Sequence, residues 1–133
     1  MNIAVACVPA SLFIVYMLRI PMMRGQAGLP GGYDNRVPRV AQQQLTGLAL
    51  RAKGAHENGF EAFMAFSAAI CLALGVGMST APPVVGLAVL HVVARAASVA
   101  AFLGNFPTPR SLIWGVGFVS TLAIFAVALA HAA

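Results

Sequence analysis

The sequence predicts an all-α membrane protein, built as a bundle of four transmembrane helices. Of its 133 residues, 60% are hydrophobic and only 8% are charged, against roughly 25% charged in an ordinary soluble domain. The mean hydropathy is +0.87, which is typical of a chain whose surface mostly faces hydrocarbon. Four spans of about 20 residues use about 80 residues, so the remaining chain suffices only for connections. Residues 1–133 are therefore expected to form a single transmembrane domain.

The first span is expected at about residues 2–20. Met1 to Leu18 carries no charge, and Arg19 follows. A cleaved signal peptide is the alternative, but no basic segment precedes this stretch and no small-residue cleavage site follows it. Pro21 and the Pro30-Gly31-Gly32 run then predict a polar loop over residues 21–38.

An amphipathic helix is expected from Arg39, leading without a break into the second span. Its apolar positions share one face of a helix, and they are Leu45, Leu48, Ala49 and Ala52. The second span is expected at about residues 57–79 and the third at 82–103, joined by a Ser-Thr-Ala-Pro-Pro turn. The connection over residues 104–109 contains two prolines, and an uncharged run follows it. The fourth span is therefore expected at about 111–131.

The basic residues predict the orientation of the bundle. Seven of the eight lie on the side of the first and third connections, which the positive-inside rule makes cytoplasmic. They are Arg19, Arg24, Arg36, Arg39, Arg51, Lys53 and Arg110. We therefore expect a multi-pass protein of the cell inner membrane, with both termini on the non-cytoplasmic side. The net charge of +5 does not indicate nucleic acid, because the basic residues flank apolar runs.

The eighth basic residue, Arg95, lies inside the third span and is the strongest indication of a functional site. An ionisable group at this depth costs a few kcal/mol, so a partner is expected. Glu61 enters the second span from the same side, Asn58 shares its helix face, and Arg51 lies about two turns further back. These four residues are expected to surround one polar pocket that opens to the cytoplasm.

Two other interpretations of Arg95 remain open from the residues alone. A pair with Glu61 would only neutralise two buried charges and fix the packing of two helices, or Arg95 would extend to the interface. His91, one turn from Arg95, is expected to be a packing residue. No cluster with the spacing of a metal site is present, nor is a nucleophile beside a base. The third span is rich in small residues such as Ala96, Ala97 and Ala100, which favours close helix contacts and oligomerisation.

Several segments of the chain together match a known pattern. They are Gly32 to Arg39, Arg51, Ala55 to Phe63, Ala94-Arg95 and Pro109 to Trp114. With them the chain resembles the MAPEG family, the membrane-associated proteins in eicosanoid and glutathione metabolism, and in particular its short bacterial members. The resemblance covers nearly the whole chain, and its most specific parts are the Asn-x-x-Glu step and the intramembrane arginine.

The resemblance implies a homotrimer that binds glutathione as co-substrate in clefts between subunits, near the cytoplasmic face. Asn58, Glu61 and Arg95 match the glutathione-contacting residues of the family, whereas Arg51 and Arg110 match family arginines loosely. Arg110 is expected to favour the thiolate of glutathione. The expected activity is glutathione-dependent transfer to, or peroxide reduction of, lipophilic substrates.

The sequence departs from the family pattern at three positions. Gly54 stands where an arginine is expected, and Ser98 and Phe102 stand in place of two tyrosines. Loss of two hydroxyl contacts at roughly 1 kcal/mol each would weaken glutathione binding tenfold or more. The alternative function is therefore a non-catalytic accessory or scaffold subunit of a larger membrane assembly. A small transporter or lipid binder that uses the same pocket is a third hypothesis.

Overall fold

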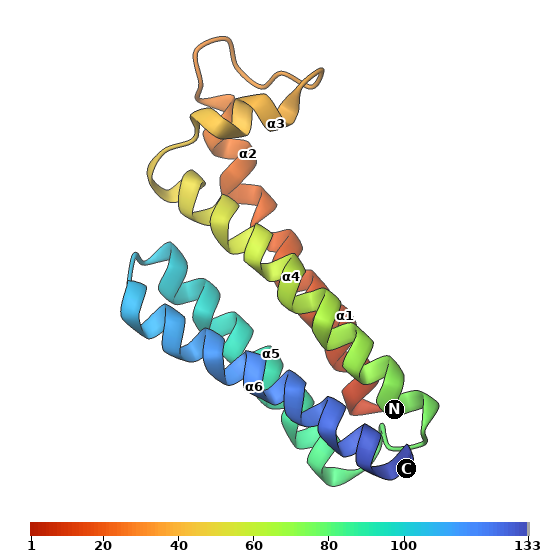
Figure 1. Ribbon diagram of the computed structural model, residues 1–133. Coiled ribbons are helices and arrows are strands. Elements are labelled where there is room, and N and C mark those ends of the chain that lie inside the picture. Colours follow the sequence, from red (N-terminus) through yellow and green to blue (C-terminus); the bar gives the residue numbers. More distant parts are fainter. Residues whose placement is uncertain (133) are drawn as a thin grey trace.

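Four long helical rods run alternately up and down (Figure 1), in a computed structural model that describes residues 1–132. The first rod consists of α1 (Ile3–Met17) and α2 (Arg19–Ala27), and the second is α4 (Gly47–Gly75). The third and fourth are α5 (Pro82–Leu103) and α6 (Pro107–Ala132). Within residues 1–132, these four rods are long and apolar enough to cross a membrane. The predicted all-α transmembrane bundle is confirmed.

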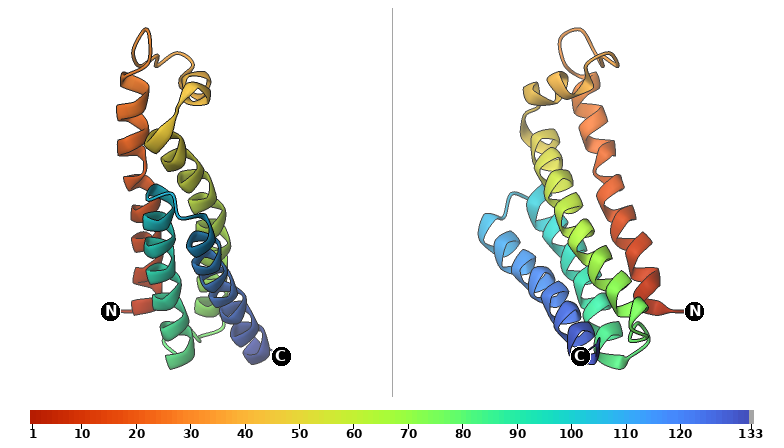
Figure 2. Two further views of the ribbon diagram at one scale, coloured as in Figure 1. Left: turned by 90° about the vertical axis from the view of Figure 1, so that its left-hand side faces the viewer. Right: turned by 45° about the vertical axis from the view of Figure 1, so that its right-hand side comes forward.

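The rods pack as two pairs. The α1–α2 rod lies along α4, and α5 lies along α6 (Figures 1 and 2). Both termini and the α4–α5 turn lie at one end, with the connections after α2 and α5 at the other. At 1.5 Å per residue, the 29 residues of α4 extend about 44 Å and the 22 of α5 about 33 Å. The first pair therefore projects beyond the second at the end rich in basic residues.

The predicted loop over residues 21–38 is wrong in its first part, because the helix continues to Ala27. The regular hydrogen-bond pattern of the helix is interrupted at Leu18, whose N–H donates to the Val15 carbonyl, three residues back. Pro21 therefore falls in the first turn of a new helix, where a missing N–H is tolerated. The buried Gln26 donates from Nε2 to the Pro38 carbonyl at 3.0 Å, and this bond fixes the remaining loop against α2.

The expected unbroken lead-in to the second span is also interrupted. The short α3 (Pro38–Ala41) and the 3₁₀ turn η1 (Gln42–Gln44) precede an extended segment at Leu45 and Thr46. Gly47, at φ 53°, then begins α4 in the left-handed region that favours glycine. Leu45 and Ala49 are still buried, as their apolar character predicts, because α2 approaches them closely at Gly25.

The core is built mainly from alanine and a few large side chains. One cluster of buried residues surrounds Phe66 and Ile70 of α4 and Ile124 of α6, towards the end that carries the termini. A second cluster joins Leu18 and Met22 to Ala52 and Ala55. Gly59 allows α1 to approach α4, since a Cβ there would lie 2.9 Å from Cγ2 of Val15. This contact sets the rotation of α4 about its own axis.

Candidate functional site

Arg95 is held inside the bundle by an asparagine. Its side chain is 4% exposed, and Nη2 donates to Oδ1 of Asn58 across the α4–α5 contact at 3.0 Å. Nη1 is buried and has no hydrogen-bond partner among residues 1–132. A buried guanidinium with an unused N–H group is costly, so Nη1 of Arg95 is free to donate a hydrogen bond to the acceptor of a ligand.

The ion pair considered between Glu61 and Arg95 is not formed. Within residues 1–132 the single ion pair is Lys53–Glu57, at 2.7 Å, and the Glu61 side chain is exposed. The rotation of α4 explains the difference. Gly59 faces α1, so Asn58, about 100° away, faces α5, whereas Glu61, about 200° away, faces outward. Arg95 is buried rather than extended to the interface.

Two adjoining pockets lie where α4, α5 and α6 meet, and Trp114 lines both. The upper pocket, nearer the basic end, has a volume of about 520 Å³. The lower pocket has a volume of about 230 Å³ and includes both Glu61 and Arg95 in its wall. The upper pocket is lined by Gly54, Asn58, Ser98, Phe102, Arg110, Ser111 and Trp114. The lower is lined by Glu61, Ala62, Ala65, His91, Arg95, Trp114, Phe118 and Thr121.

His91 forms the floor of the lower pocket through a fixed set of contacts. Its ring, 1% exposed, stacks on Phe66 with centroids 4.0 Å apart. Nδ1 lies 3.1 Å from the Gly117 carbonyl and 3.0 Å from Oγ1 of Thr121, which itself donates to that carbonyl. Since a carbonyl only accepts, Nδ1 carries the hydrogen and Nε2 is the free acceptor. The expected packing role is therefore accompanied by an unpartnered nitrogen within residues 1–132.

Phe102 occupies the space above Gly54. A Cβ built on Gly54 would lie 2.9 Å from Cζ of the Phe102 ring. The guanidinium carbon of Arg110 lies 4.5 Å from the centroid of the same ring, within the range of a cation–π contact. Gly54 and Phe102, two of the departures from the family pattern, thus pack against each other. The Phe102 ring also contacts Arg110 and so orients its side chain.

The structure brings together four of the five predicted site residues. Asn58 and Arg110 line the upper pocket, and Glu61 and Arg95 line the lower. Arg51 does not join them, because its Nε donates to the Leu103 carbonyl at 3.0 Å. Arg51 therefore caps the carboxyl end of α5, where a cation is favourable.

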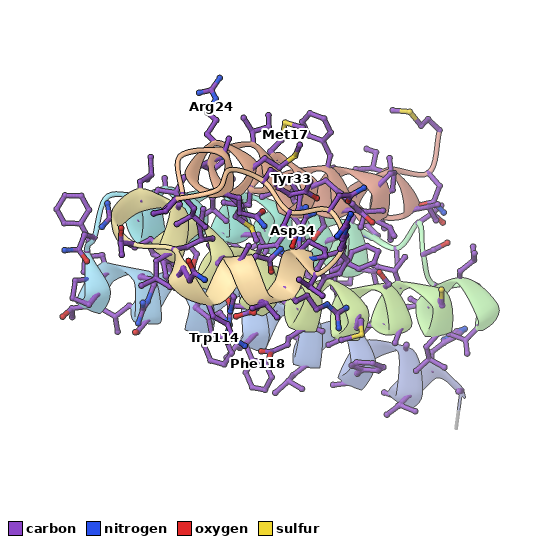
Figure 3. All side chains as sticks on the ribbon, turned by 90° about the horizontal axis from the view of Figure 1, so that it is seen from above. Met17, Arg24, Tyr33, Asp34, Trp114 and Phe118 are labelled. Carbon is purple, nitrogen blue, oxygen red and sulfur yellow. The ribbon has the colours of Figure 1, made fainter. Side chains whose placement is uncertain are left out.

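Trp114 and Phe118 belong to the site but were not predicted for it. Their rings stack with centroids 5.2 Å apart, and Figure 3 shows them projecting together from the side of α6. The available signal was their spacing, since Arg110, Trp114 and Phe118 follow at intervals of four and share one face of a helix. This face gives the pockets an aromatic outer wall.

The arrangement suits a small ligand that carries charges of both signs. Arg95 and Arg110 can receive carboxylates, and Glu61 can receive an ammonium group. Apolar surface from Ala62, Ala65 and Phe118 lies beside these polar groups, as in most small-molecule sites.

The comparisons agree with this architecture. The model of the MAPEG family matches residues 3–130. No curated protein and no solved structure matches the chain. The match covers all four rods and both pockets, and the chain is therefore a member of the MAPEG family and a multi-pass membrane protein.

Proposed function

We propose that the protein binds glutathione in the two pockets between α4, α5 and α6 and uses its thiol on lipophilic substrates. The MAPEG family includes glutathione transferases and related proteins, so membership makes this the first activity to consider. The observation that carries the proposal is the buried Arg95, with one N–H bonded to Asn58 and another unused at the pocket.

The charges of glutathione fit the groups that surround the pockets. Its two carboxylates correspond to Arg95 and Arg110, its ammonium to Glu61, and its amides to Asn58 and Ser98. These residues lie in the walls of pockets that share Trp114. Arg51, which was also predicted to contact the ligand, keeps its bond to Leu103 in this proposal.

The thiol reacts as a thiolate, and a nearby guanidinium favours that ionisation. Arg110 is the group proposed for this role. In transfer, the sulfur forms a bond to an electrophilic carbon while a leaving group departs or a double bond is saturated. In peroxide reduction, two glutathione molecules are oxidised to the disulfide while one hydroperoxide becomes an alcohol and water.

We place the site at the cytoplasmic face of an inner membrane, in a homotrimer. The basic residues gather at the end of the bundle that carries the connections after α2 and α5, which the positive-inside rule makes cytoplasmic. Both termini then lie on the other side. The exposed alanines of α5, Ala96, Ala97 and Ala100, offer a surface for close contact with another subunit.

The second candidate is a non-catalytic accessory subunit of a larger membrane assembly. The Gly54–Phe102 contact favours it, because the ring fills the space that an arginine at position 54 would need. Phe102 and Ser98 also provide one short hydroxyl where the family pattern has two tyrosines. The two candidates differ in whether glutathione binds at useful affinity.

Calorimetric titration of the purified protein in detergent distinguishes them. We expect glutathione and S-methylglutathione to bind alike, because the proposed contacts are to charges and amides. Arg95→Met and Glu61→Gln should each weaken binding at least tenfold, whereas Glu57→Gln, one turn away on the same helix and paired with Lys53, should not. The thiolate absorbance of bound glutathione should disappear in Arg110→Gln.

Absence of binding, or binding that is the same in Arg95→Met, Glu61→Gln and Glu57→Gln, would reject the glutathione site. Isolation of the protein in mild detergent with a stoichiometric partner would then support the accessory role. A trimer free of other proteins would argue against that role.

A further inference from the structure

A further cavity, separate from the two glutathione pockets, lies beside the first part of α4. It has a volume of about 720 Å³ and lies between α2, the α3–η1 segment and α4, at the basic end of the molecule in Figure 1. None of the residues assigned above to the glutathione site lines it. Its walls are formed by Arg19, Met22, Pro38, Arg39, Gln42, Gln43, Lys53, His56, Glu57 and Phe60.

The cavity is cationic, and its cations come from three different elements. Arg19 belongs to α2, Arg39 to α3 and Lys53 to α4. Glu57 is the one carboxylate in the wall, and Lys53 neutralises it through their ion pair at 2.7 Å. Two arginines therefore face the cavity without a carboxylate partner among residues 1–132, so an anion would be attracted there.

The polar groups around the arginines are suited to a phosphate. Gln42 and Gln43 add amide N–H donors to the wall, and arginine binds phosphate oxygens through two parallel hydrogen bonds. Nε2 of His56 is buried and has no partner among residues 1–132, so it adds one further group that a ligand could engage.

The floor of the cavity leads into the apolar part of the bundle. Phe60 lies edge-on to His56 above it, with centroids 5.0 Å apart, and edge-on to Tyr16 below it, at 5.7 Å. Tyr16 is exposed, and so is Phe13, one turn further along α1. An alkyl chain that leaves the cavity would therefore run along aromatic surface in the direction of the opposite membrane face.

The depth of the cavity corresponds to the phosphate level of a bilayer. Arg19 lies 16 residues from Ile3 along the first rod, and Lys53 lies 22 residues from Gly75 along α4. At 1.5 Å per residue these are about 24 and 33 Å, which bracket the hydrocarbon thickness of about 30 Å.

We propose that this cavity binds the phosphate ester of an anionic phospholipid headgroup, with Arg19 and Arg39 as its main ligands and the acyl chain lying over Phe60 and Tyr16. Basic pockets between transmembrane helices on the cytoplasmic side recognise such headgroups generally. A soluble phosphate ester shares the same chemistry, but it would leave the aromatic path below the cavity unused. The site is independent of glutathione binding.

Spin-labelled lipids provide the test. The full-length protein is reconstituted in phosphatidylcholine vesicles with a small fraction of labelled phosphatidylglycerol or labelled phosphatidylcholine, and the protein-bound fraction is measured by electron paramagnetic resonance. We expect several-fold preference for phosphatidylglycerol. Arg19→Gln and Arg39→Gln should each reduce the preference at least threefold, and the double variant should abolish it.

Arg24→Gln is the matched control, since it removes the same charge from α2. Arg24 is exposed, and Figure 3 shows it pointing away from the rest of the molecule. Because Arg39 is also exposed and lies in the short α3, Arg39→Gln should keep the fold, which circular dichroism would verify. An equal loss of preference in Arg24→Gln would show general charge attraction and overturn the site.

Two soluble competitors identify the source of the anion. Excess glycerol 3-phosphate or glutathione should leave the bound phosphatidylglycerol in place. Displacement by glycerol 3-phosphate would overturn the lipid assignment in favour of a soluble phosphate ester. If glutathione displaced the phosphatidylglycerol, and this displacement were lost in Arg19→Gln, the lipid assignment would be overturned and the cavity would be a glutathione site.

Discussion

Arg95 of α5 and Asn58 of α4 are joined by a hydrogen bond of 3.0 Å from Nη2 to Oδ1. The two partners are not equivalent, because Arg95 is buried and Asn58 lines the upper pocket, where water reaches it. Removing Asn58 therefore leaves a buried guanidinium without this acceptor, whereas removing Arg95 leaves an amide that water can hydrate.

This asymmetry predicts the stability of two variants. Asn58→Leu should lower the free energy of unfolding by about 2 kcal/mol or more, and Arg95→Met by less than about 1 kcal/mol. The double variant should lose less unfolding free energy than the sum of the losses in the two single variants. Reversible unfolding in mixed micelles measures all three, and Lys53→Met, which breaks an exposed ion pair, should cost less than about 0.5 kcal/mol. A larger loss in Arg95→Met than in Asn58→Leu would contradict the prediction.

Gly54 and Phe102 provide a second prediction. Gly54→Ala should destabilise the protein by about 1–2 kcal/mol, because the new Cβ would lie 2.9 Å from Cζ of Phe102. In a Phe102→Ala background the same change should stabilise by about 0.5–1 kcal/mol, as alanine does in an open helix. Thermal unfolding in detergent shows whether Gly54→Ala lowers or raises the stability in each background.

Gly115 of α6 is the control for this experiment, because a Cβ there meets nothing within 4 Å. Gly115→Ala should stabilise slightly in both backgrounds. If Gly54→Ala had the same effect with and without Phe102, the contact would not be important.

The tautomer of His91 is a third prediction. The acceptors around Nδ1 require a hydrogen on that nitrogen and none on Nε2 when the ring is neutral. Long-range ¹H–¹⁵N NMR of the labelled protein in micelles should show a protonated Nδ1. Thr121→Val should keep this state, since the Gly117 carbonyl remains as acceptor. A spectrum with a protonated Nε2 and a bare Nδ1 would refute the proposed bonding.

The ring of Phe102 provides a functional prediction. If glutathione binds in the upper pocket, Phe102→Tyr adds a hydroxyl to its wall and should tighten binding by about five- to tenfold, corresponding to about 1 kcal/mol. Phe106→Tyr, which changes an exposed ring in the α5–α6 connection, should leave the affinity unchanged. Calorimetry measures both, and equal effects of the two substitutions would argue against the placement of glutathione.

The sequence was sufficient to predict the number of spans, because apolar runs of about 20 residues with few or no charges mark them directly. It did not predict how far the helices extend. A proline breaks a helix from within but is tolerated in a first turn. Pro21 is tolerated because the interruption at Leu18 starts a new helix just before it. The start of α4 was missed for a similar reason, because the left-handed Gly47 is not visible as a break in an apolar pattern.

For the site, the sequence identified Arg95 because a charge inside an apolar run is rare. It did not identify the partner, since Asn58 and Glu61 lie within one turn of each other at similar depth. The choice is made on an adjacent face of α4, where Gly59 packs against Val15 and turns Asn58 towards α5. Helix rotation is a property of the packed bundle, and no local pattern in α4 specifies it.

The ring that fills the space above Gly54 also constrains how this chain can change over evolutionary time. An arginine introduced at position 54 while the phenylalanine remains would place its first side-chain carbon 2.9 Å from the ring, so the ring would have to shift. Exchange at position 102 to a smaller residue would relieve this contact, but it would leave Arg110 without the aromatic face that supports it. The two positions therefore constrain each other, and a chain altered at only one of them is less well packed than this one.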